Sequence, residues 1–215
     1  MRRPWIAPVV IAAMLAASLL AFPSLPREIP THWNLRWEAD GWMAKWPGAF
    51  LFPGLGLLVW LLLLFLPRID PRRQHYERFR ETYWLLVNWI VLLIAFIEVL
   101  SFGEALGWPI VGPRLMLVAL GVVLIAIGNY LPRVRSNWWI GIRTPWTLES
   151  ESVWKATHRL AGRCFVGAGV TFLLTIVAPA RLRGWIAGTA VMLAAVVPLV
   201  FSYVAFRRER SKGVA

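Results

Sequence analysis

Six long runs of apolar residues alternate along the chain with short segments that carry most of its charge. A helix that crosses the roughly 30 Å hydrocarbon core of a bilayer needs about 20 residues, because each residue advances the helix by about 1.5 Å. The runs have this length, and we predict an all-α fold: a bundle of six transmembrane helices. They are residues 5–22, 48–66, 83–102, 114–131, 162–178 and 185–206.

The composition agrees with a membrane protein. Hydrophobic residues make up 59% of the chain and charged residues 16%, whereas an average soluble domain is about 25% charged. The single cysteine, Cys164, excludes an intramolecular disulfide and a cysteine-based metal site. Residues 1–22 also resemble a secretory signal peptide, but no small-residue cleavage site follows the apolar run. We therefore expect an uncleaved first transmembrane helix.

The distribution of Lys and Arg between the predicted helices indicates the orientation of the chain. Segments on the side of the N-terminus carry 17 of these residues, and segments on the opposite side carry 6. Because basic residues are enriched on the cytoplasmic side, we predict that both termini are cytoplasmic in a multi-pass protein of the bacterial cell (inner) membrane. A net charge of +12 is also typical of nucleic-acid-binding proteins. The loop charges explain it here, and we expect no direct binding of nucleic acid.

The predicted helices divide the chain into two modules. Residues 1–82 contain two helices, an outer loop at 23–47 and an inner loop at 67–82. Residues 83–215 contain four helices and an inner loop at 132–161. The outer loop and the second inner loop are long for a helical bundle, and loops of this length are often functional.

The second inner loop contains a predicted amphipathic helix that runs into the fifth membrane helix. Pro132 ends the preceding helix, and Thr147 is the expected N-cap, with Glu149 and Glu151 in the first turn. Apolar residues then recur every three or four positions, whereas His158 lies off this stripe. Spacing alone favours a helix that only anchors the chain at the membrane surface.

The same loop resembles the signature of a known family. The run GNYLPRVRSNWWIGIRTPWTLESESVWKATHRLAG, from residue 128 to residue 162, is similar to the signature of the Sdp immunity (SdpI-like) membrane proteins. In the outer loop, IPTHWN at 29–34 and DGW at 40–42 resemble the N-terminal module usual in that family. PRIDPRR at 67–73 resembles its second loop. The resemblance covers essentially the whole chain.

The resemblance implies a function but no catalytic chemistry. The family's namesake sits in the cell membrane, protects its producer from a secreted peptide toxin, and holds a cytoplasmic repressor at the membrane. We therefore expect a membrane immunity and signalling receptor without enzymatic activity or cofactor. Its expected partners are the lipid bilayer, a secreted peptide toxin outside and a cytoplasmic repressor inside.

Three sets of residues are candidates for functional sites. The candidate partner or relay site in the inner loop comprises Asn129, Arg133, Arg135, Asn137, Trp139, Gly141, Arg143, Thr144, Pro145, Trp146, Trp154, His158 and Arg159. The candidate sensing site in the outer loop comprises Pro30, Thr31, His32, Trp33, Asn34, Asp40 and Gly41. The polar residues expected inside the membrane are Asn88 and Glu98.

Two of these candidates carry a specific expectation. Arg143 lies between Trp139 and Trp146, and a guanidinium can stack on either indole while it binds a carboxylate. This favours a docking point for a cytoplasmic partner or for a carboxylate of the helix at 149–163. The simpler role of the surrounding basic residues is orientation and contact with anionic lipid. Glu98 lies four or five residues from the outer boundary, so we expect its carboxylate to reach the interface by snorkelling.

The alternative function is a small transporter or channel. The tripeptide Leu-Pro-Arg follows both the first and the fourth helix, as an inverted repeat requires, but it also follows the second. Gly184 and Gly188 form a GxxxG pattern that favours close packing of the last helix. An enzyme is disfavoured because the sequence lacks HExxH, GxSxG and Walker motifs. The three histidines fall on different predicted sides of the membrane, so they cannot form a shared metal site.

Overall fold

The computed structural model describes residues 5–34, 38–108 and 113–213. Within them, six helices are long and apolar enough to cross a membrane, and each coincides with one of the predicted transmembrane segments to within one residue or extends beyond it. The all-α bundle is therefore confirmed. The helices are α1 (Ile6–Ala21), α2 (Lys45–Ile69), α4 (Arg80–Ala105), α5 (Pro113–Tyr130), α7 (Glu151–Leu174) and α8 (Ala180–Ser211).

Shorter elements join the long helices. Two strands lie between α1 and α2, and two short helices lie between α2 and α4 and between α5 and α7. Single turns of 3₁₀-helix follow α1, α5 and α7. In chain order these elements are η1 (Phe22–Ser24), β1 (Glu28–Trp33), β2 (Ala39–Ala44), α3 (Arg73–Glu77), η2 (Leu131–Arg133), α6 (Pro145–Glu149) and η3 (Thr175–Val177).

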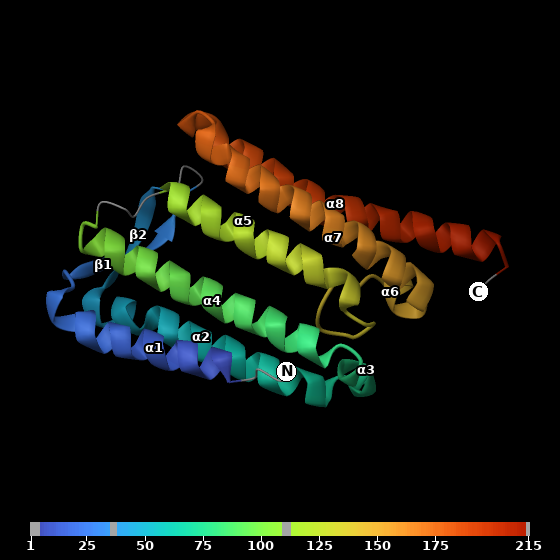
Figure 1. The fold of residues 1–215 in the computed structure, drawn as a ribbon, viewed down its shortest axis with the longest axis horizontal. Helices are drawn as coiled ribbons and strands as arrows, with labels where there is room; N and C mark the ends of the chain where they lie inside the picture. The colour runs from blue at the N-terminus through green and yellow to red at the C-terminus, as the bar shows by residue number, and fades with distance from the viewer. Residues whose placement is uncertain (1–4, 35–37, 109–112, 214–215) are drawn as a thin grey trace.

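The helices form two groups that meet in the middle of the molecule (Figure 1). Helices α1, α2 and α4 pack together on one side, α5, α7 and α8 pack together on the other, and α4 contacts α5 between them. Successive long helices run in opposite directions, so one end of the bundle carries the strands and the other carries α3 and α6. We call these the hairpin end and the loop end. Helix α1 begins at the loop end and α8 ends there, because a chain that crosses a membrane six times returns to the side on which it started.

The strands form an antiparallel hairpin that the sequence analysis did not predict. Glu28 pairs with Ala44 and Trp33 with Ala39, with irregular register between Pro30 and Trp33. The hairpin forms because one residue of β1, Ile29, is fully buried in a cluster beside α1, α2 and α4. Burial of one apolar face is what stabilises so short a sheet.

Glycines set the distance between α5 and α7. A Cβ added at Gly169 would lie 2.5 Å from the carbonyl oxygen of Gly121, and one added at Gly162 would lie 2.6 Å from that of Gly128. Both glycine pairs are seven residues apart on their helices, so they repeat on one face of each. The GxxxG prediction was wrong for Gly188, because a Cβ there would meet nothing within 4 Å. The backbones of α5 and α7 therefore touch, as is usual between membrane helices with small residues at the contact.

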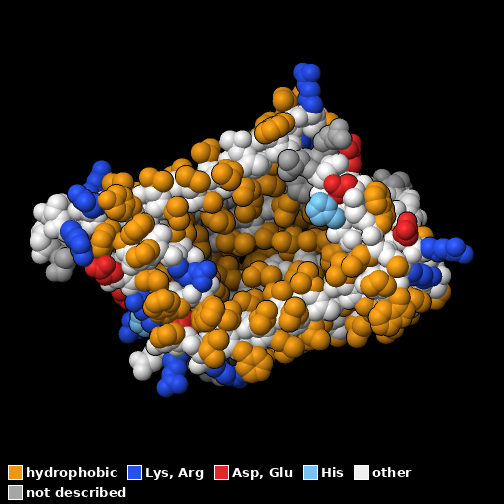
Figure 2. All heavy atoms as spheres, turned by 180° about the vertical axis from the view of Figure 1, so that it is seen from behind, with side chains coloured by type: hydrophobic (Ala, Val, Ile, Leu, Met, Phe, Trp, Pro, Cys, Tyr) orange, Lys and Arg blue, Asp and Glu red, His pale blue; other side chains and the backbone are white. Residues whose placement is uncertain are grey.

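The molecular surface suits a bilayer. Figure 2 shows hydrophobic side chains across the middle of one face, with most Lys and Arg side chains near its two ends. Many large apolar residues are exposed on the outer faces of the helices, including Leu193 and Leu199 of α8 and Leu58 of α2. Such a band would be unfavourable in water and is favourable against lipid.

A buried polar scaffold beneath the signature loop

The centre of the candidate inner-loop site is a buried carboxylate from a different loop. We call residues 131–150 the signature loop. Asp70 is 3% exposed, and its carboxylate accepts hydrogen bonds from the Tyr76 hydroxyl and from the backbone N–H of Trp138, both at 2.9 Å. It also accepts from the backbone N–H of Arg72 at 2.7 Å. The residue therefore fastens the loop after α2 to the signature loop.

Tyr76 stays protonated in this setting. Burial, the hydrogen bond to Asp70 and the negative charge of that carboxylate together raise the pKa of the Tyr76 hydroxyl well above its usual range. The hydroxyl is thus a permanent donor to Asp70. Neither residue was among the predicted site residues, although the PRIDPRR motif that contains Asp70 was already noted for its resemblance.

Asn137 shapes the signature loop itself. It is fully buried, and its side-chain oxygen accepts from the backbone N–H groups of Trp139 at 2.8 Å and Ile140 at 2.7 Å. Its amide nitrogen donates to the carbonyls of Arg135 at 2.8 Å and Ile140 at 3.0 Å. One side chain thus satisfies four backbone groups that no helix or sheet would satisfy, which explains an asparagine here.

Arg72 and His75 complete the attachment between the two loops. The Arg72 guanidinium donates to the Ser136 hydroxyl and, at 2.6 Å, to the carbonyl of Leu148. The Nδ1 of His75 lies 2.7 Å from the carbonyl of Ser136. Because these contacts join residues more than sixty positions apart, spacing within the signature could not reveal them.

His158 is a structural residue. The prediction that it lies off the apolar stripe of its helix was wrong, because it is fully buried and stacks on Trp154 with ring centroids 4.0 Å apart. Its Nδ1 lies 2.8 Å from the carbonyl of Trp154, and its Nε2 accepts from the N–H of Ile142 at 3.1 Å. Trp154 and His158 are four positions apart, so they share one helix face. An accepting Nε2 and a donating Nδ1 define a neutral ring.

The His158 ring leaves room only for glycine at position 141. The φ of Gly141, 108°, lies in the region that favours glycine, and a Cβ at this position would overlap the His158 ring. The fully buried Trp154 adds a hydrogen bond from its Nε1 to the carbonyl of Val134, at 2.8 Å. These three signature residues therefore hold the loop against the start of α7.

The prediction that Thr147 is the N-cap was wrong, because a separate short helix, α6, precedes α7. Thr144, and not Thr147, caps a helix: it precedes Pro145 and forms a capping box with Thr147. Ser150 then adopts an extended conformation and caps α7 by accepting from the N–H of Val153. The chain breaks between α6 and α7, so Glu149 ends the first helix and does not enter the first turn of the second. Helix α7 runs unbroken from Glu151 into the fifth membrane span, as expected.

Arg143 does not sit between two indole rings as proposed from the sequence. Its Nη1 donates to the carbonyl of Trp138 at 2.7 Å. The Trp146 ring instead packs against Tyr203 of α8, with centroids 5.3 Å apart, and its Nε1 donates to Ser202. Among the described residues, no cation–π contact pairs Arg143 with an indole. The guanidinium remains largely exposed.

The predicted inner-loop residues therefore separate into a buried set and an exposed set, with two half-buried residues besides. The buried set builds the loop, and the exposed set faces outward at the loop end. Asn137, Thr144, Trp154 and His158 are buried; Asn129, Arg133, Arg135, Trp139, Arg143, Pro145 and Arg159 are exposed. Gly141 and Trp146 are half-buried.

The predicted outer-loop residues all lie on or beside the hairpin, at the opposite end of the bundle (Figure 1). His32 and Asp40 face each other across the strands, with Nδ1 and Oδ1 2.6 Å apart, and both are exposed. The N–H of Asn34 donates to the carbonyl of Glu38 at 3.0 Å. A Cβ at Gly41 would lie 2.9 Å from the Cβ of His32, which explains a small residue opposite the histidine. Thr31 lies at the irregular step of the register.

The hairpin is fastened to α4. The Ser101 hydroxyl donates to the carbonyl of Pro30 at 2.6 Å, and the Trp33 Nε1 donates to the Glu104 carboxylate at 2.7 Å. At the loop end, Tyr83 and Val87 of the same helix are buried against Val134 and Trp154. Helix α4 therefore contacts both candidate sites.

Glu98 does not reach the interface. The snorkelling prediction was wrong, because Glu98 is 3% exposed and lies 2.7 Å from the Ser18 hydroxyl of α1. Ser18 also lies 2.7 Å from the carbonyl of Ala49, whose usual helical partner would be the N–H that Pro53 lacks. The Ser18 hydroxyl thus offers its one proton to two acceptors on different helices, the Glu98 carboxyl and the carbonyl of Ala49. Asn88, the other polar residue predicted inside the membrane, is buried in the half of α4 that is nearer the loop end.

Within the described ranges, no group of three or more His, Cys, Asp and Glu side chains is placed to hold a metal ion.

Comparison with known proteins supports the resemblance in both halves of the chain. Residues 133–203 match the SdpI/YfhL protein family, and residues 9–57 match a domain of unknown function, DUF1648. Immunity protein SdpI of Bacillus subtilis (strain 168) is 25% identical over 169 residues, which cover 79% of this chain and 79% of that protein. No solved structure matches. The chain is a multi-pass cell-membrane protein, and its resemblance to the Sdp immunity (SdpI-like) family is confirmed.

Proposed function

We propose that this protein is a membrane immunity protein that binds a secreted peptide toxin at the hairpin and passes that event to the signature loop. The observation that carries the proposal is the position of α4. Its 26 residues span about 39 Å, and it is hydrogen-bonded to the hairpin at one end and packed beneath the signature loop at the other. A shift of this one helix changes both candidate sites.

The hairpin offers a suitable surface for an amphipathic peptide. Trp42 and Met43 on β2 and Trp46 at the start of α2 are exposed, next to the exposed His32–Asp40 pair. Aromatic side chains beside polar ones at a membrane surface can hold a peptide that is itself partly buried in the interface. The match to the immunity protein of Bacillus subtilis supports a toxin as the ligand.

The energies involved are adequate for a switch. A hydrogen bond to a charged group contributes about 1.5–3 kcal/mol, so a toxin that displaces Trp33 from Glu104 would change the balance between two positions of α4 by roughly 10- to 100-fold. At the loop end, the exposed Arg135, Arg143 and Arg159 form a basic surface. We infer that an acidic face of a cytoplasmic repressor docks there.

The test uses a Bacillus subtilis strain that lacks its own Immunity protein SdpI. Cells that express this chain are challenged with culture supernatant of the parent strain, and survival is counted. The expected result is protection by the natural chain and at least tenfold less protection by Trp33→Phe, which removes the indole donor and keeps a ring. Trp185→Phe is the matched control, since this exposed indole of α8 lies outside the hairpin and its described contacts include no hydrogen bond. Equal survival of both variants at equal membrane levels would contradict the relay through α4.

A small transporter is the second candidate, and one observation favours it. Glu98 is enclosed between α1, α2 and α4 rather than exposed at the interface. Carboxyl groups enclosed inside a membrane bundle often couple transport to protons. Loss of protection in a well-folded Glu98→Gln variant would favour transport over the receptor.

A further inference from the structure

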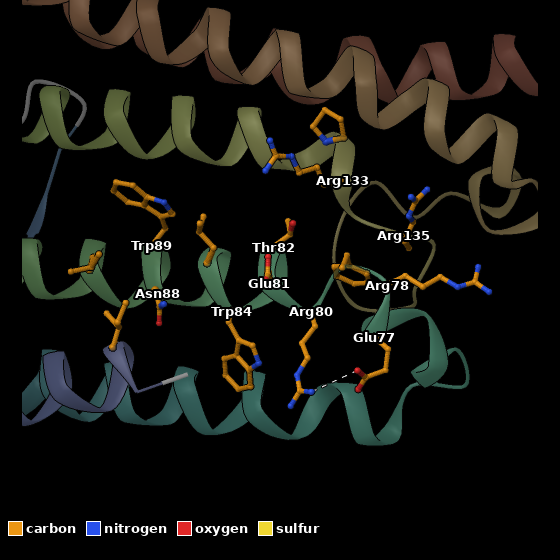
Figure 3. A pocket seen from close by; sticks show the side chains of 15 residues that line it. Glu77, Arg78, Arg80, Glu81, Thr82, Trp84, Asn88, Trp89, Arg133 and Arg135 are labelled. Atoms are coloured by element: carbon orange, nitrogen blue, oxygen red, sulfur yellow. Dashed lines mark ion pairs between the residues drawn. The ribbon is translucent and has the colours of Figure 1, made fainter. Parts of the chain in front are cut away.

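An open cavity of about 1240 Å³ lies at the loop end of α4 and shares Arg133 and Arg135 with the candidate inner-loop site. Figure 3 shows its two kinds of lining. Four arginines line the loop end: Arg78 and Arg80 from the turn before α4 and its first residue, and Arg133 and Arg135 from the signature loop. Their side chains extend in different directions, Arg80 away from Arg133 (Figure 3). Farther along α4, toward the hairpin end, the lining becomes apolar and aromatic.

The arginines give the cavity a net positive charge. Two carboxylates, Glu77 and Glu81, also line it, which leaves an excess of two positive charges. Glu77 lies 3.7 Å from Arg80. In the described part of the chain, Arg78, Arg133 and Arg135 have no carboxylate within ion-pair distance. The charge of this end is therefore available to an anionic ligand.

The apolar part of the cavity lies where lipid would lie. Trp84, Leu85, Trp89 and Leu92 come from one spanning helix, and Ile6 comes from the start of α1. The rise from Arg80 to Leu92 is about 18 Å, close to the half-thickness of about 15 Å of the hydrocarbon core. Leu92 is 40% exposed, so the cavity opens sideways from the bundle. A ligand that fills it must have an anionic head and an apolar tail.

We propose that this cavity binds an anionic phospholipid, with the headgroup at its arginine-lined end and an acyl chain along α4. Guanidinium groups pair with phosphate oxygens through two parallel hydrogen bonds, and basic pockets between membrane helices suit anionic headgroups. The half-buried indoles of Trp84 and Trp89 lie at the depth of the upper acyl chain. An acidic soluble peptide would satisfy the arginines but leave the apolar wall uncovered.

The lipid would stabilise the contact between the two halves of the bundle. Arg133 and Arg135 follow α5, whereas Arg78 and Arg80 belong to the α4 side, so a lipid headgroup that contacts residues of both sides connects the groups. Arg133 is also placed over the ring of Tyr130, at 5.0 Å, which fixes the guanidinium near the end of α5.

The test is the thermal unfolding of the full chain in detergent with three additives: dioleoyl phosphatidylglycerol, dioleoyl phosphatidylcholine and inorganic phosphate. The expected result is a rise in melting temperature with phosphatidylglycerol alone. The double variant R133Q/R135Q should need about tenfold more phosphatidylglycerol for the same rise, and Arg78→Gln, from the other wall, should weaken it in the same direction. The matched control is R68Q/R73Q, two arginines at the loop end outside the cavity.

Each other outcome overturns the proposal. An equal rise with phosphatidylcholine means that no headgroup is selected, and an equal rise with inorganic phosphate means that the site binds a free anion. Unchanged lipid dependence in both R133Q/R135Q and Arg78→Gln leaves the arginines to a protein partner. If R133Q/R135Q unfolds at a lower temperature without lipid, Arg78→Gln alone decides the question.

Discussion

Replacing Gly169 by alanine tests whether the close approach of α5 and α7 holds the C-terminal half together. The new methyl group would lie 2.5 Å from the carbonyl oxygen of Gly121 and 2.7 Å from the Ile125 side chain. Ordinary contacts are about 3.4 Å or longer, and the nearest obstacle is backbone, which cannot rotate away. The helices must therefore separate by several tenths of an ångström along their whole contact.

Overpacking of this kind costs about 1–3 kcal/mol. Alanine also favours a helix over glycine by up to about 1 kcal/mol, which offsets part of the loss. We expect Gly169→Ala to destabilise the protein by roughly 1–2 kcal/mol. Gly167→Ala is the matched control, two residues away on the same helix, where a Cβ would meet nothing within 4 Å. It gains the helix preference without the clash and should be neutral or slightly stabilising.

The assay is reversible unfolding of the purified variants in mixed detergent, followed by circular dichroism. The separation between the helices should also loosen the signature loop, because α7 carries Trp154 and His158 at its start. Limited proteolysis of that loop should accelerate in Gly169→Ala and not in Gly167→Ala. Equal unfolding free energies for the two variants, within about 0.5 kcal/mol, would refute the argument that the glycines set the helix distance.

Four further predictions concern the loops and the membrane. Asp70→Asn should destabilise the protein by about 1–3 kcal/mol in the same unfolding assay, because an amide offers one acceptor oxygen where the carboxylate serves three donors. Gly141→Ala should abolish the folded signature loop, seen as rapid proteolysis, because a Cβ overlaps the His158 ring in a left-handed backbone. Glu98→Gln should keep stability near that of the natural chain, since the amide can still hydrogen-bond to the hydroxyl that the carboxyl contacts, whereas Glu98→Leu should lower the melting temperature. In a cysteine-free background, cysteine at 27 should react with an impermeant thiol reagent in intact cells and cysteine at 74 only after permeabilisation; the reverse pattern would refute the predicted orientation.

The membrane helices could be predicted from the sequence because a bilayer imposes one length on every spanning segment. Each of the six predicted segments overlaps one observed span, four of them completely and the first and fifth except for one end residue. The fifth helix begins eleven residues earlier than the predicted span, at Glu151, because its first turns are amphipathic, with Lys155 and Arg159 exposed and Trp154 and His158 buried inside the protein. A hydropathy profile measures how well a segment suits lipid, so it marks the apolar span and not the amphipathic turns that precede it.

The outer hairpin was missed for a different reason. Its strands have six residues each and are stabilised by Ile29 and by two hydrogen bonds to α4, not by a repeating pattern. Strand prediction depends on alternation over several residues, and here Pro30 and the irregular register interrupt it. The positions of Ser101 and Glu104, about seventy residues away, carry the missing information.

The same limit applied to the signature loop, where the chemistry of each residue was visible but its partner was not. A pattern can show that Asn137 and His158 are polar residues in a loop and a helix, but only the fold shows that both are fully buried and satisfy backbone groups. Thr144 and Thr147 are both good caps, and the choice between them depends on the extended backbone at Ser150.

The buried residues beneath the signature loop limit which signature residues can carry a signal to a partner. We call this set the scaffold: Asp70, Tyr76, Asn137, Trp154 and His158. Asn137 and His158 hold the loop in one conformation, so replacing them removes the loop and reports nothing about docking. Arg143 and Arg159 are exposed, and their replacement leaves the scaffold's buried hydrogen bonds in place. In the relay that we propose, a shift of α4 reaches the exposed set through the scaffold, because Tyr83 and Val87 pack in one cluster with Val134 and Trp154. Such a relay requires the scaffold to move as a unit, and the stiffness that its many hydrogen bonds provide would allow it to do so.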